Sequence, residues 1–145
     1  MRSRSCGGMD TCDYHHRDTE MNQEKDKLSE AVIGAAIEVH RTLGPGLLES
    51  AYEECLCFEL ARRQVPFERQ VPLPVDYKGV KLDYGYRLDL LVAKQLIVEL
   101  KCVERIEPIH EAQLLTYLRL SRCRAGLLMN FHVPLLKDGI VRRVL

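Results

Sequence analysis

The sequence predicts an α/β domain in which a mixed central β-sheet is flanked by helices on both faces. Two segments with helical spacing of apolar residues come first, and several strand-like segments and a further helix follow them. An apolar segment after that last helix completes a strand–helix–strand order, which places two parallel strands in one sheet. A chain of 145 residues has the length of one domain. A domain of this size buries about two-thirds of its unfolded surface when it folds.

The charge balance gives no sign of a strong nonspecific attraction to nucleic acid. Lys and Arg number 21, and Asp and Glu also number 21, so only a local basic groove remains open. Apolar runs are far shorter than the ~20 residues of a membrane helix, and no apolar segment follows the first arginines as in a signal peptide. The six cysteines are scattered along the chain, so we expect reduced thiols in a cytoplasmic protein that does not associate with membranes.

Residues 1–27 predict a disordered N-terminal extension. Large apolar residues are nearly absent there, and five basic side chains mix with six acidic ones. Cys6 and Cys12 precede His15 and His16, a set of residues that invites a zinc interpretation. Their spacing matches no common zinc module and their neighbours are polar, so we favour an extension without a metal. The folded domain is then expected to cover the remaining residues, 28–145.

Two helices are expected at the start of this domain. Apolar residues recur at steps of three or four from Leu28 onward, and the Gly-Pro-Gly at 44–46 ends the first helix, because Pro cannot continue it. The same spacing predicts a second helix that lasts to about Gln64. Pro66 then returns the chain to extended structure.

Strands are expected to follow. Residues 67–82 predict a strand, a turn at Lys78 and Gly79, and a second strand, with Pro72 and Pro74 favouring a sheet edge.

The centre of the sheet is expected farther along the chain. Segments 84–92 and 95–103 predict an apolar hairpin, and residues 107–121 predict a helix with Pro108 in its first turn. Closing strands are expected over 125–131 and 139–145.

Charged residues interrupt the two strands of the hairpin. Glu99 and Lys101 lie on one face of their strand, since side chains alternate, and by themselves they could form its solvated face. Asp89 lies among apolar residues in the neighbouring strand, where an unpaired carboxylate is costly to bury. A loop with an odd number of residues centred on Lys94 places Asp89 opposite Glu99 and Arg87 opposite Lys101. A two-residue loop would instead place the two carboxylates on opposite faces.

The opposed carboxylates of Asp89 and Glu99 predict a site for a cation. They repel unless a proton or a cation lies between them, although Lys101 and Arg87 offer a purely structural compensation. Carboxylate oxygens are the ligands that Mg²⁺ prefers, with water and substrate phosphate in the remaining positions. A lysine beside such an ion can stabilise a hydroxide nucleophile or the charge that develops on phosphorus. The pattern of Asp89, Glu99 and Lys101 therefore predicts phosphodiester hydrolysis.

The same residues carry a family resemblance. The pattern D…VELK, from Asp89 to Lys101, resembles the signature of the PD-(D/E)xK nucleases, the restriction-endonuclease-like superfamily. GLLESAY at 46–52 resembles the motif of the bacterial GxxExxY protein family, which is assigned to that superfamily. QLLTY at 113–117 is similar to the QxxxY helix motif of its exonuclease-like branch, and EVHRTLGPGLLE and GLLMNF resemble flanking blocks of the GxxExxY family. The resemblance covers residues 28–145 and implies a restriction-endonuclease-like sandwich.

The resemblance also implies roles for individual residues. Asp89 and Glu99 would bind Mg²⁺, or Mn²⁺ in its place, with the backbone carbonyl of Leu100 as a third ligand. Lys101 would be the catalytic lysine. Glu49 would be the helical carboxylate that completes the metal site, although its place near a helix N-terminus is favoured by the helix dipole in any case.

Further residues of the helices have two interpretations each. Gln113 and Tyr117 lie one turn apart and resemble groups that position the substrate or the lysine. Tyr117 and Tyr52 also lie on apolar stripes that are typical of a core. His40 is expected to cap the first helix rather than to act in catalysis, and His110 lies one turn before Gln113, where it could face the site.

These observations predict a metal-dependent nuclease that hydrolyses phosphodiester bonds in DNA, with RNA as the alternative substrate. A different class remains open, in which a non-catalytic module keeps the fold and binds nucleic acid or a protein partner. A third hypothesis is a toxin–antitoxin-like partner that co-purifies with another protein. One short domain without an added DNA-reading element also favours a homodimer or a protein partner that supplies more binding surface.

Overall fold

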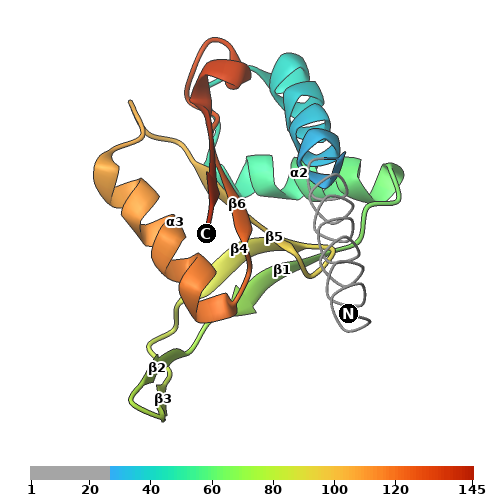
Figure 1. The fold of residues 1–145 in the computed structure, drawn as a ribbon. Coiled ribbons are helices and arrows are strands. Elements are labelled where there is room, and N and C mark those ends of the chain that lie inside the picture. The colour runs from blue at the N-terminus through green and yellow to red at the C-terminus, as the bar shows by residue number, and fades with distance from the viewer. Residues whose placement is uncertain (1–26) are drawn as a thin grey trace, which may run out of the picture.

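A computed structural model describes residues 27–145 of the chain. The expected N-terminal extension, with Cys6, Cys12, His15 and His16, lies outside the described residues. The described elements are a first helix over residues 27–43, α2 (Glu49–Arg62), β1 (Phe67–Pro72), β2 (Val75–Tyr77), β3 (Val80–Leu82), β4 (Arg87–Val92), β5 (Leu96–Lys101), α3 (Pro108–Ser121), β6 (Ala125–Asn130), the 3₁₀ helix η1 (Leu136–Gly139) and β7 (Ile140–Val144) (Figure 1). This is the predicted order of two helices, antiparallel strands, one helix and closing strands.

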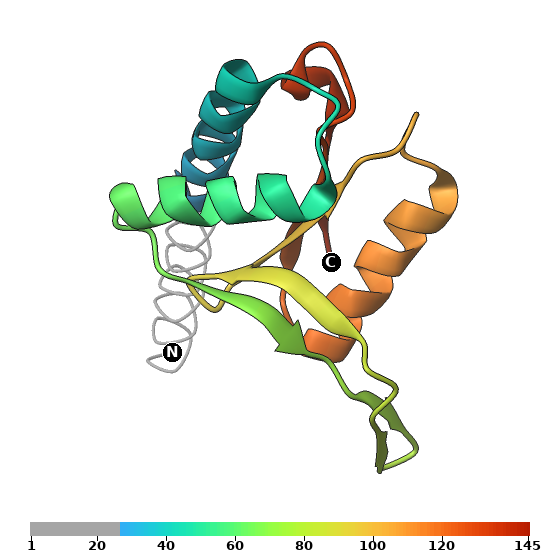
Figure 2. The same ribbon diagram turned by 180° about the vertical axis from the view of Figure 1, so that it is seen from behind.

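A five-stranded mixed sheet forms the centre of the fold. Its strand order is β1-β4-β5-β6-β7, and all neighbouring pairs are antiparallel except β5 and β6. The parallel pair is the one that the strand–helix–strand order predicts, with α3 as the crossover. A separate hairpin of β2 and β3 projects from one end of the sheet, away from the helices (Figures 1 and 2).

Helices cover both faces of the sheet and create two cores. The first helix and α2 pack on one face, and α3 packs on the other (Figure 2). The fully buried side chains of the larger core include Val32, Tyr52, Leu56, Leu60, Leu90, Val98, Leu127 and Phe131. The smaller core, beneath α3, contains Leu73, Leu88, Ile97, Leu114, Tyr117, Leu118 and Leu128. Strand β5 contributes to both cores, so its position is defined from two sides.

The segment predicted as two strands forms three. Strand β1 ends at Pro72, and Pro74 follows shortly after, because two residues without an N–H group cannot continue a ladder. β1 lies at the edge of the sheet, as these prolines predict. The predicted turn at Lys78 and Gly79 is present, with φ of 52° and 86° at the two residues. Gln64 has a φ of 59° after α2, so the chain makes a left-handed turn there at a residue that carries a side chain.

The loop between the first helix and α2 is held by an aromatic residue. Tyr52 is fully buried, and its ring stacks on that of Phe131 with centroids 4.5 Å apart. The backbone N–H of Leu47 donates to its hydroxyl (3.2 Å), which donates to the carbonyl of Gly44. The His40 imidazole contacts the carbonyl of Phe131 at 3.1 Å instead of capping the helix through its side chain. Tyr52 and His40 therefore both stabilise the core.

Two general expectations can be compared with the described residues. The four cysteines within residues 27–145 form no disulfide bond and are free thiols. In the same part of the chain, every helix is too short or too polar to cross a bilayer.

We predict that Tyr52→Phe lowers the free energy of unfolding by about 1 kcal/mol, because it removes two hydrogen bonds and keeps the stacked ring. Urea unfolding followed by circular dichroism measures the change. Tyr84→Phe, at a ring that is 71% exposed, is the matched control and should leave the midpoint unchanged. Equal midpoints for wild type and Tyr52→Phe would contradict the assigned role.

Candidate functional site

The hairpin that carries the charged residues has an odd-numbered loop. Val92 pairs with Leu96, so Ala93, Lys94 and Gln95 form a three-residue loop centred on Lys94. Ala93 and Lys94 both adopt positive φ, 51° and 56°, which turns the chain back on itself. This is the register on which the predicted site depends, and it excludes the alternative two-residue loop.

Beyond this register the two strands separate, and carboxylates replace the backbone ladder. The last ladder pair between β4 and β5 is Leu90 with Val98. At the next position, the N–H of Asp89 donates to Glu99 Oε2 (3.0 Å). The N–H of Leu100 donates to Asp89 Oδ2 (2.9 Å). Each acid therefore accepts a backbone hydrogen bond from the opposite strand, and the pair lies where β4 and β5 diverge.

Arg87 does not compensate this pair. β4 and β5 are no longer paired at Arg87 and Lys101, so the expected opposition of these two residues does not form. Arg87 pairs instead with Pro72 of β1, and its guanidinium donates to the carbonyl of Gln70 (3.3 Å). The structural alternative, in which Lys101 and Arg87 together balance the two acids, therefore keeps only Lys101.

The other neighbour of β4 is also distorted next to Asp89. The β1–β4 register is continuous except at Gln70 and Asp89, and Gln70 has a φ of 50°. The Gln70 side chain donates to Glu53 Oε1 of α2 (2.7 Å), and Arg69 donates to Glu53 Oε2 (3.0 Å). The buried Glu53 on α2 thus holds Gln70, the residue that lies opposite Asp89 where the β1–β4 pairing is interrupted. Sequence reasoning missed Glu53 and Gln70, although a glutamate on the buried side of a helix was a signal for the first.

Glu99 is the most perturbed acid of the site. Its side chain is only 6% exposed, and burial, followed by the charge of Asp89, raises its pKa well above the usual range of a carboxyl group. The two acids are close enough to share a proton, and the charge of Lys101 offsets only part of the effect. In the absence of a cation, the Asp89–Glu99 pair therefore holds a proton to a higher pH than a solvent-exposed carboxyl group does.

Glu49 approaches from the other side of β5. It is the first residue of α2, and although the residue is exposed, its carboxyl group is partly shielded from solvent. This shielding raises the pKa of Glu49, the charge of Lys101 lowers it and the charge of Asp89 raises it. The backbone N–H of Cys102 lowers it further through a hydrogen bond. Glu49 therefore lies within electrostatic reach of the site, at the end of β5.

Two of the three predicted carboxylates come together. Asp89 and Glu99 form a pair, whereas within residues 27–145 no three His, Cys, Asp or Glu side chains are close enough to hold one ion. Glu49 therefore does not complete a three-carboxylate cluster. The carbonyl of Leu100 faces the diverging strand, because the N–H and C=O of one strand residue point to the same edge and its N–H binds Asp89.

Lys101 lines a cavity beneath α3. The cavity has a volume of about 660 Å³, and its lining includes Lys101, Gln113, Tyr117, His110 and Tyr86. Gln113 Nε2 donates to the Tyr117 hydroxyl (3.1 Å), so the predicted pair on α3 is formed. Burial and then the charge of Glu99 raise the pKa of Tyr117, which places its hydroxyl near the acids. The cavity therefore connects the QxxxY residues with Lys101.

His110 has a structural contact in addition to its place at the cavity. Its Nδ1 accepts the backbone N–H of Glu107 (2.9 Å), which closes the N-terminus of α3 as part of a capping box. The imidazole that could face the site is therefore engaged on one nitrogen.

Asn130 is a further residue that sequence reasoning missed. It is 1% exposed, its Oδ1 accepts the N–H of Val103 (3.1 Å) and its Nδ2 donates to the Val103 carbonyl (2.8 Å). The N–H of Phe131 donates to the Lys101 carbonyl (2.9 Å) next to it. These bonds hold the end of β5, where Lys101 lies, against the end of β6. A single polar residue in the apolar segment AGLLMNF was the signal.

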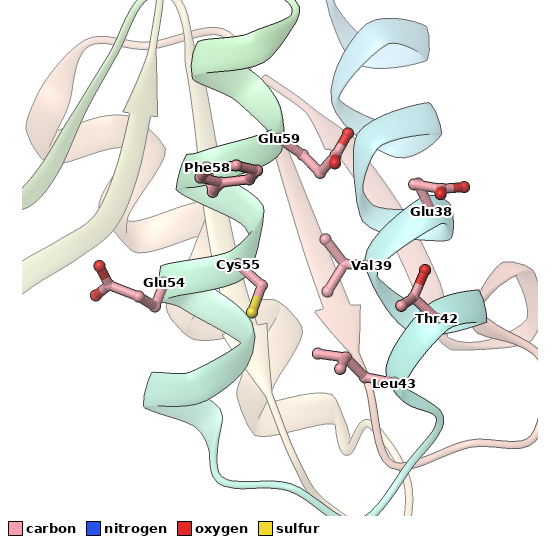
Figure 3. A pocket seen from close by; sticks show the side chains of 8 residues that line it. All are labelled: Glu38, Val39, Thr42, Leu43, Glu54, Cys55, Phe58 and Glu59. Atoms are coloured by element: carbon pink, nitrogen blue, oxygen red, sulfur yellow. The ribbon is translucent and has the colours of Figure 1, made fainter.

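A second cavity lies between the first helix and α2 (Figure 3). It measures about 370 Å³, and apolar side chains such as Val39 and Phe58 face it. Its three glutamates form ion pairs with arginines: Glu38 with Arg41, Glu54 with Arg69 and Glu59 with Arg63. None of the predicted site residues lines this cavity.

We predict that Glu99→Gln raises the stability of the metal-free protein at pH 8. The folded state keeps a proton on Glu99 that the unfolded chain releases above about pH 4.3, so wild-type stability falls as pH rises, by at most about 1.4 kcal/mol per pH unit. Glutamine cannot titrate, and its amide can donate to Asp89 as the protonated acid does. Thermal unfolding between pH 5 and 8 should show a flatter profile for Glu99→Gln.

The control for this profile is Glu68→Gln, at an exposed position of β1. It should keep the wild-type slope. A Glu99→Gln slope equal to that of wild type would contradict the protonated state of Glu99.

Comparison with known proteins identifies a family that matches most of the chain. A family model described as the PD-(D/E)XK nuclease superfamily matches residues 26–144. In the two further comparisons, no curated protein and no solved structure matches the chain. The five-stranded mixed sheet with its three helices is consistent with the restriction-endonuclease-like fold of that superfamily. The chain belongs to the PD-(D/E)XK nuclease superfamily.

Proposed function

We propose that this protein is a Mg²⁺-dependent nuclease that hydrolyses phosphodiester bonds in DNA. The observation that carries the proposal is the acid pair Asp89–Glu99, held where two strands diverge and followed on the same strand by Lys101. Membership of a nuclease superfamily supports the same conclusion. RNA is the alternative substrate, because a cation and a lysine act on the phosphate that both polymers share.

The residues present fit a divalent cation. Asp89 and Glu99 offer carboxylate oxygens, and the Leu100 carbonyl faces the same gap, so the donor set contains the hard oxygens that Mg²⁺ and Mn²⁺ accept. Mg²⁺ commonly uses one or two carboxylates and completes its shell with water and phosphate, so a third carboxylate is not required. The repulsion that raises the pKa of Glu99 would be relieved by a positive ion.

The chemistry that the bound ion supplies is polarisation of the phosphoryl oxygens and a lowered pKa for the attacking water. Around it, the Lys101 ammonium stabilises the negative charge that develops on the phosphate. Glu49 lies within electrostatic reach of that lysine and helps to orient it. Gln113 and Tyr117 line the cavity beside Lys101 and position the substrate there.

We further assign the chain to the GxxExxY family within the superfamily, with the domain at residues 28–145. Each motif residue has a physical role that supports this assignment. Gly46 has a φ of 106°, which side chains rarely adopt, and it leads into α2. Glu49 approaches Lys101, and Tyr52 bonds to the loop that contains Gly46.

We predict metal-dependent cleavage of a panel of plasmid, duplex, single-stranded DNA and RNA substrates. Asp89→Asn, Glu99→Gln and Lys101→Ala should each lower the rate by about 10²-fold or more, because each removes a group from the reacting centre. Gel electrophoresis with Mg²⁺, with Mn²⁺ and with chelator measures the activity.

Lys94→Ala is the matched control for Lys101→Ala, since Lys94 is an exposed lysine in the loop of the same hairpin. It should leave the rate unchanged. Activity that persists in Glu99→Gln and Lys101→Ala would remove these residues from the site.

The second candidate function is a non-catalytic module that binds nucleic acid or a protein partner. It is favoured by the separation of Glu49 from the acid pair, since within residues 27–145 no three-carboxylate cluster forms. Calorimetry with Mg²⁺ and Mn²⁺ separates the two functions. We predict binding at millimolar metal that is lost in Asp89→Asn and that tightens as pH rises, because a bound cation displaces the proton of Glu99. No binding to the wild type would favour the module.

A further inference from the structure

The hairpin of β2 and β3 carries an unusual concentration of exposed aromatic rings. We call residues 75–86 the arm, which projects from the end of the sheet (Figures 1 and 2). Tyr77, Tyr84 and Tyr86 are 61%, 71% and 47% exposed, and they are three of the six tyrosines in the chain. Rings as exposed as those of Tyr77 and Tyr84 contribute little to a core, so packing within the described domain does not explain these two.

The charges of the arm leave its rings accessible. Asp76 Oδ1 accepts the N–H of Gly79 (3.0 Å), and Asp83 Oδ1 accepts the N–H of Gly85 (2.9 Å), so both acids are directed at the turns of the arm itself. Lys78 Nζ lies 5.3 Å from the centroid of the Tyr77 ring. With Lys81 the arm has two cations and two carboxylates, so its net charge is zero. Its surface therefore offers aromatic rings for stacking and no strong electrostatic field.

The arm is continuous with the cavity of the proposed site. Val75 and Tyr86, at its two ends, line the same cavity as Lys101 and Tyr117. The rings of Tyr86 and Tyr117 contact each other with centroids 6.5 Å apart and planes at 53°. The base of the arm is therefore linked through Tyr86 to the cavity that Lys101 lines, and Tyr77 and Tyr84 lie farther out on the arm.

We propose that the arm binds single-stranded DNA by stacking bases on Tyr84 and Tyr77, and that it guides the strand into the cavity at Lys101. The proposal rests on the proposed nuclease function and names its substrate as single-stranded. Bases are free to stack on a protein ring only when they are unpaired, and aromatic rings with nearby cations are the usual means of binding them. The zero net charge of the chain fits this mode better than binding to a duplex through its phosphates.

Binding is tested with the full-length protein and fluorescein-labelled dT20, a duplex of equal length and a single-stranded RNA of equal length. Fluorescence anisotropy is measured in chelator, so that no cleavage occurs. Wild type should bind dT20 more tightly than the duplex or the RNA. Tyr84→Ala should weaken binding by about tenfold, Tyr77→Ala should weaken it as well, and Tyr84→Phe should keep wild-type affinity because it keeps the ring.

Phe58→Ala is the matched control, since Phe58 is 63% exposed on α2 and faces the second cavity (Figure 3). It should bind dT20 as wild type does. The proposal is overturned if Tyr84→Ala and Tyr77→Ala bind normally, if Phe58→Ala weakens binding equally, if the duplex or the RNA is bound more tightly, or if wild type binds none of the three.

Cleavage assays in Mg²⁺ separate this proposal from the nuclease function. If wild type and Tyr84→Ala bind and cleave equally while Lys101→Ala is inactive, the arm proposal fails and the nuclease stands. If no protein cleaves but binding to dT20 depends on Tyr84, the nuclease proposal fails, the arm binds a single strand, and delivery to a catalytic site is overturned.

Discussion

The site depends on one exchange of hydrogen bonds between two neighbouring strands. Asp89 and Glu99 each accept a backbone N–H from the opposite strand, at the position where the ladder between β4 and β5 ends. The exchange satisfies the backbone, keeps two acids side by side and opens a gap that the Leu100 carbonyl faces. Without it, the strands would either continue their ladder or separate, and the two acids would lose their common position.

The rest of the fold holds this exchange in place from several directions. The larger core defines one face of β5 and the smaller core defines the other. On the outer side of β4, Glu53 of α2 holds Gln70 in its left-handed conformation beside Asp89. Asn130 holds the far end of β5. Together these contacts keep the buried Glu99 next to the half-buried Asp89, an arrangement that costs stability and is typical of functional sites.

The cavity and the arm extend the site along the sheet. Lys101, Tyr117 and Tyr86 line one cavity, and the arm continues from it away from the helices (Figure 1). A polymer that lay along this path would meet aromatic rings before it met Lys101. Such a path gives a chain of zero net charge a means of holding a substrate, because stacking replaces much of the attraction that a basic groove would supply.

The sequence by itself determined the order of the elements, the parallel pair and the face shared by Glu99 and Lys101. These features follow from local spacing, strand alternation and the strand–helix–strand order. The sequence did not determine the number of residues in the hairpin loop, and only the tertiary structure showed that it has three. The structure also decided that Arg87 turns away and that Gln70 and Glu53 support Asp89. Those outcomes depend on contacts between segments far apart in the chain, and no local pattern of residues records such contacts.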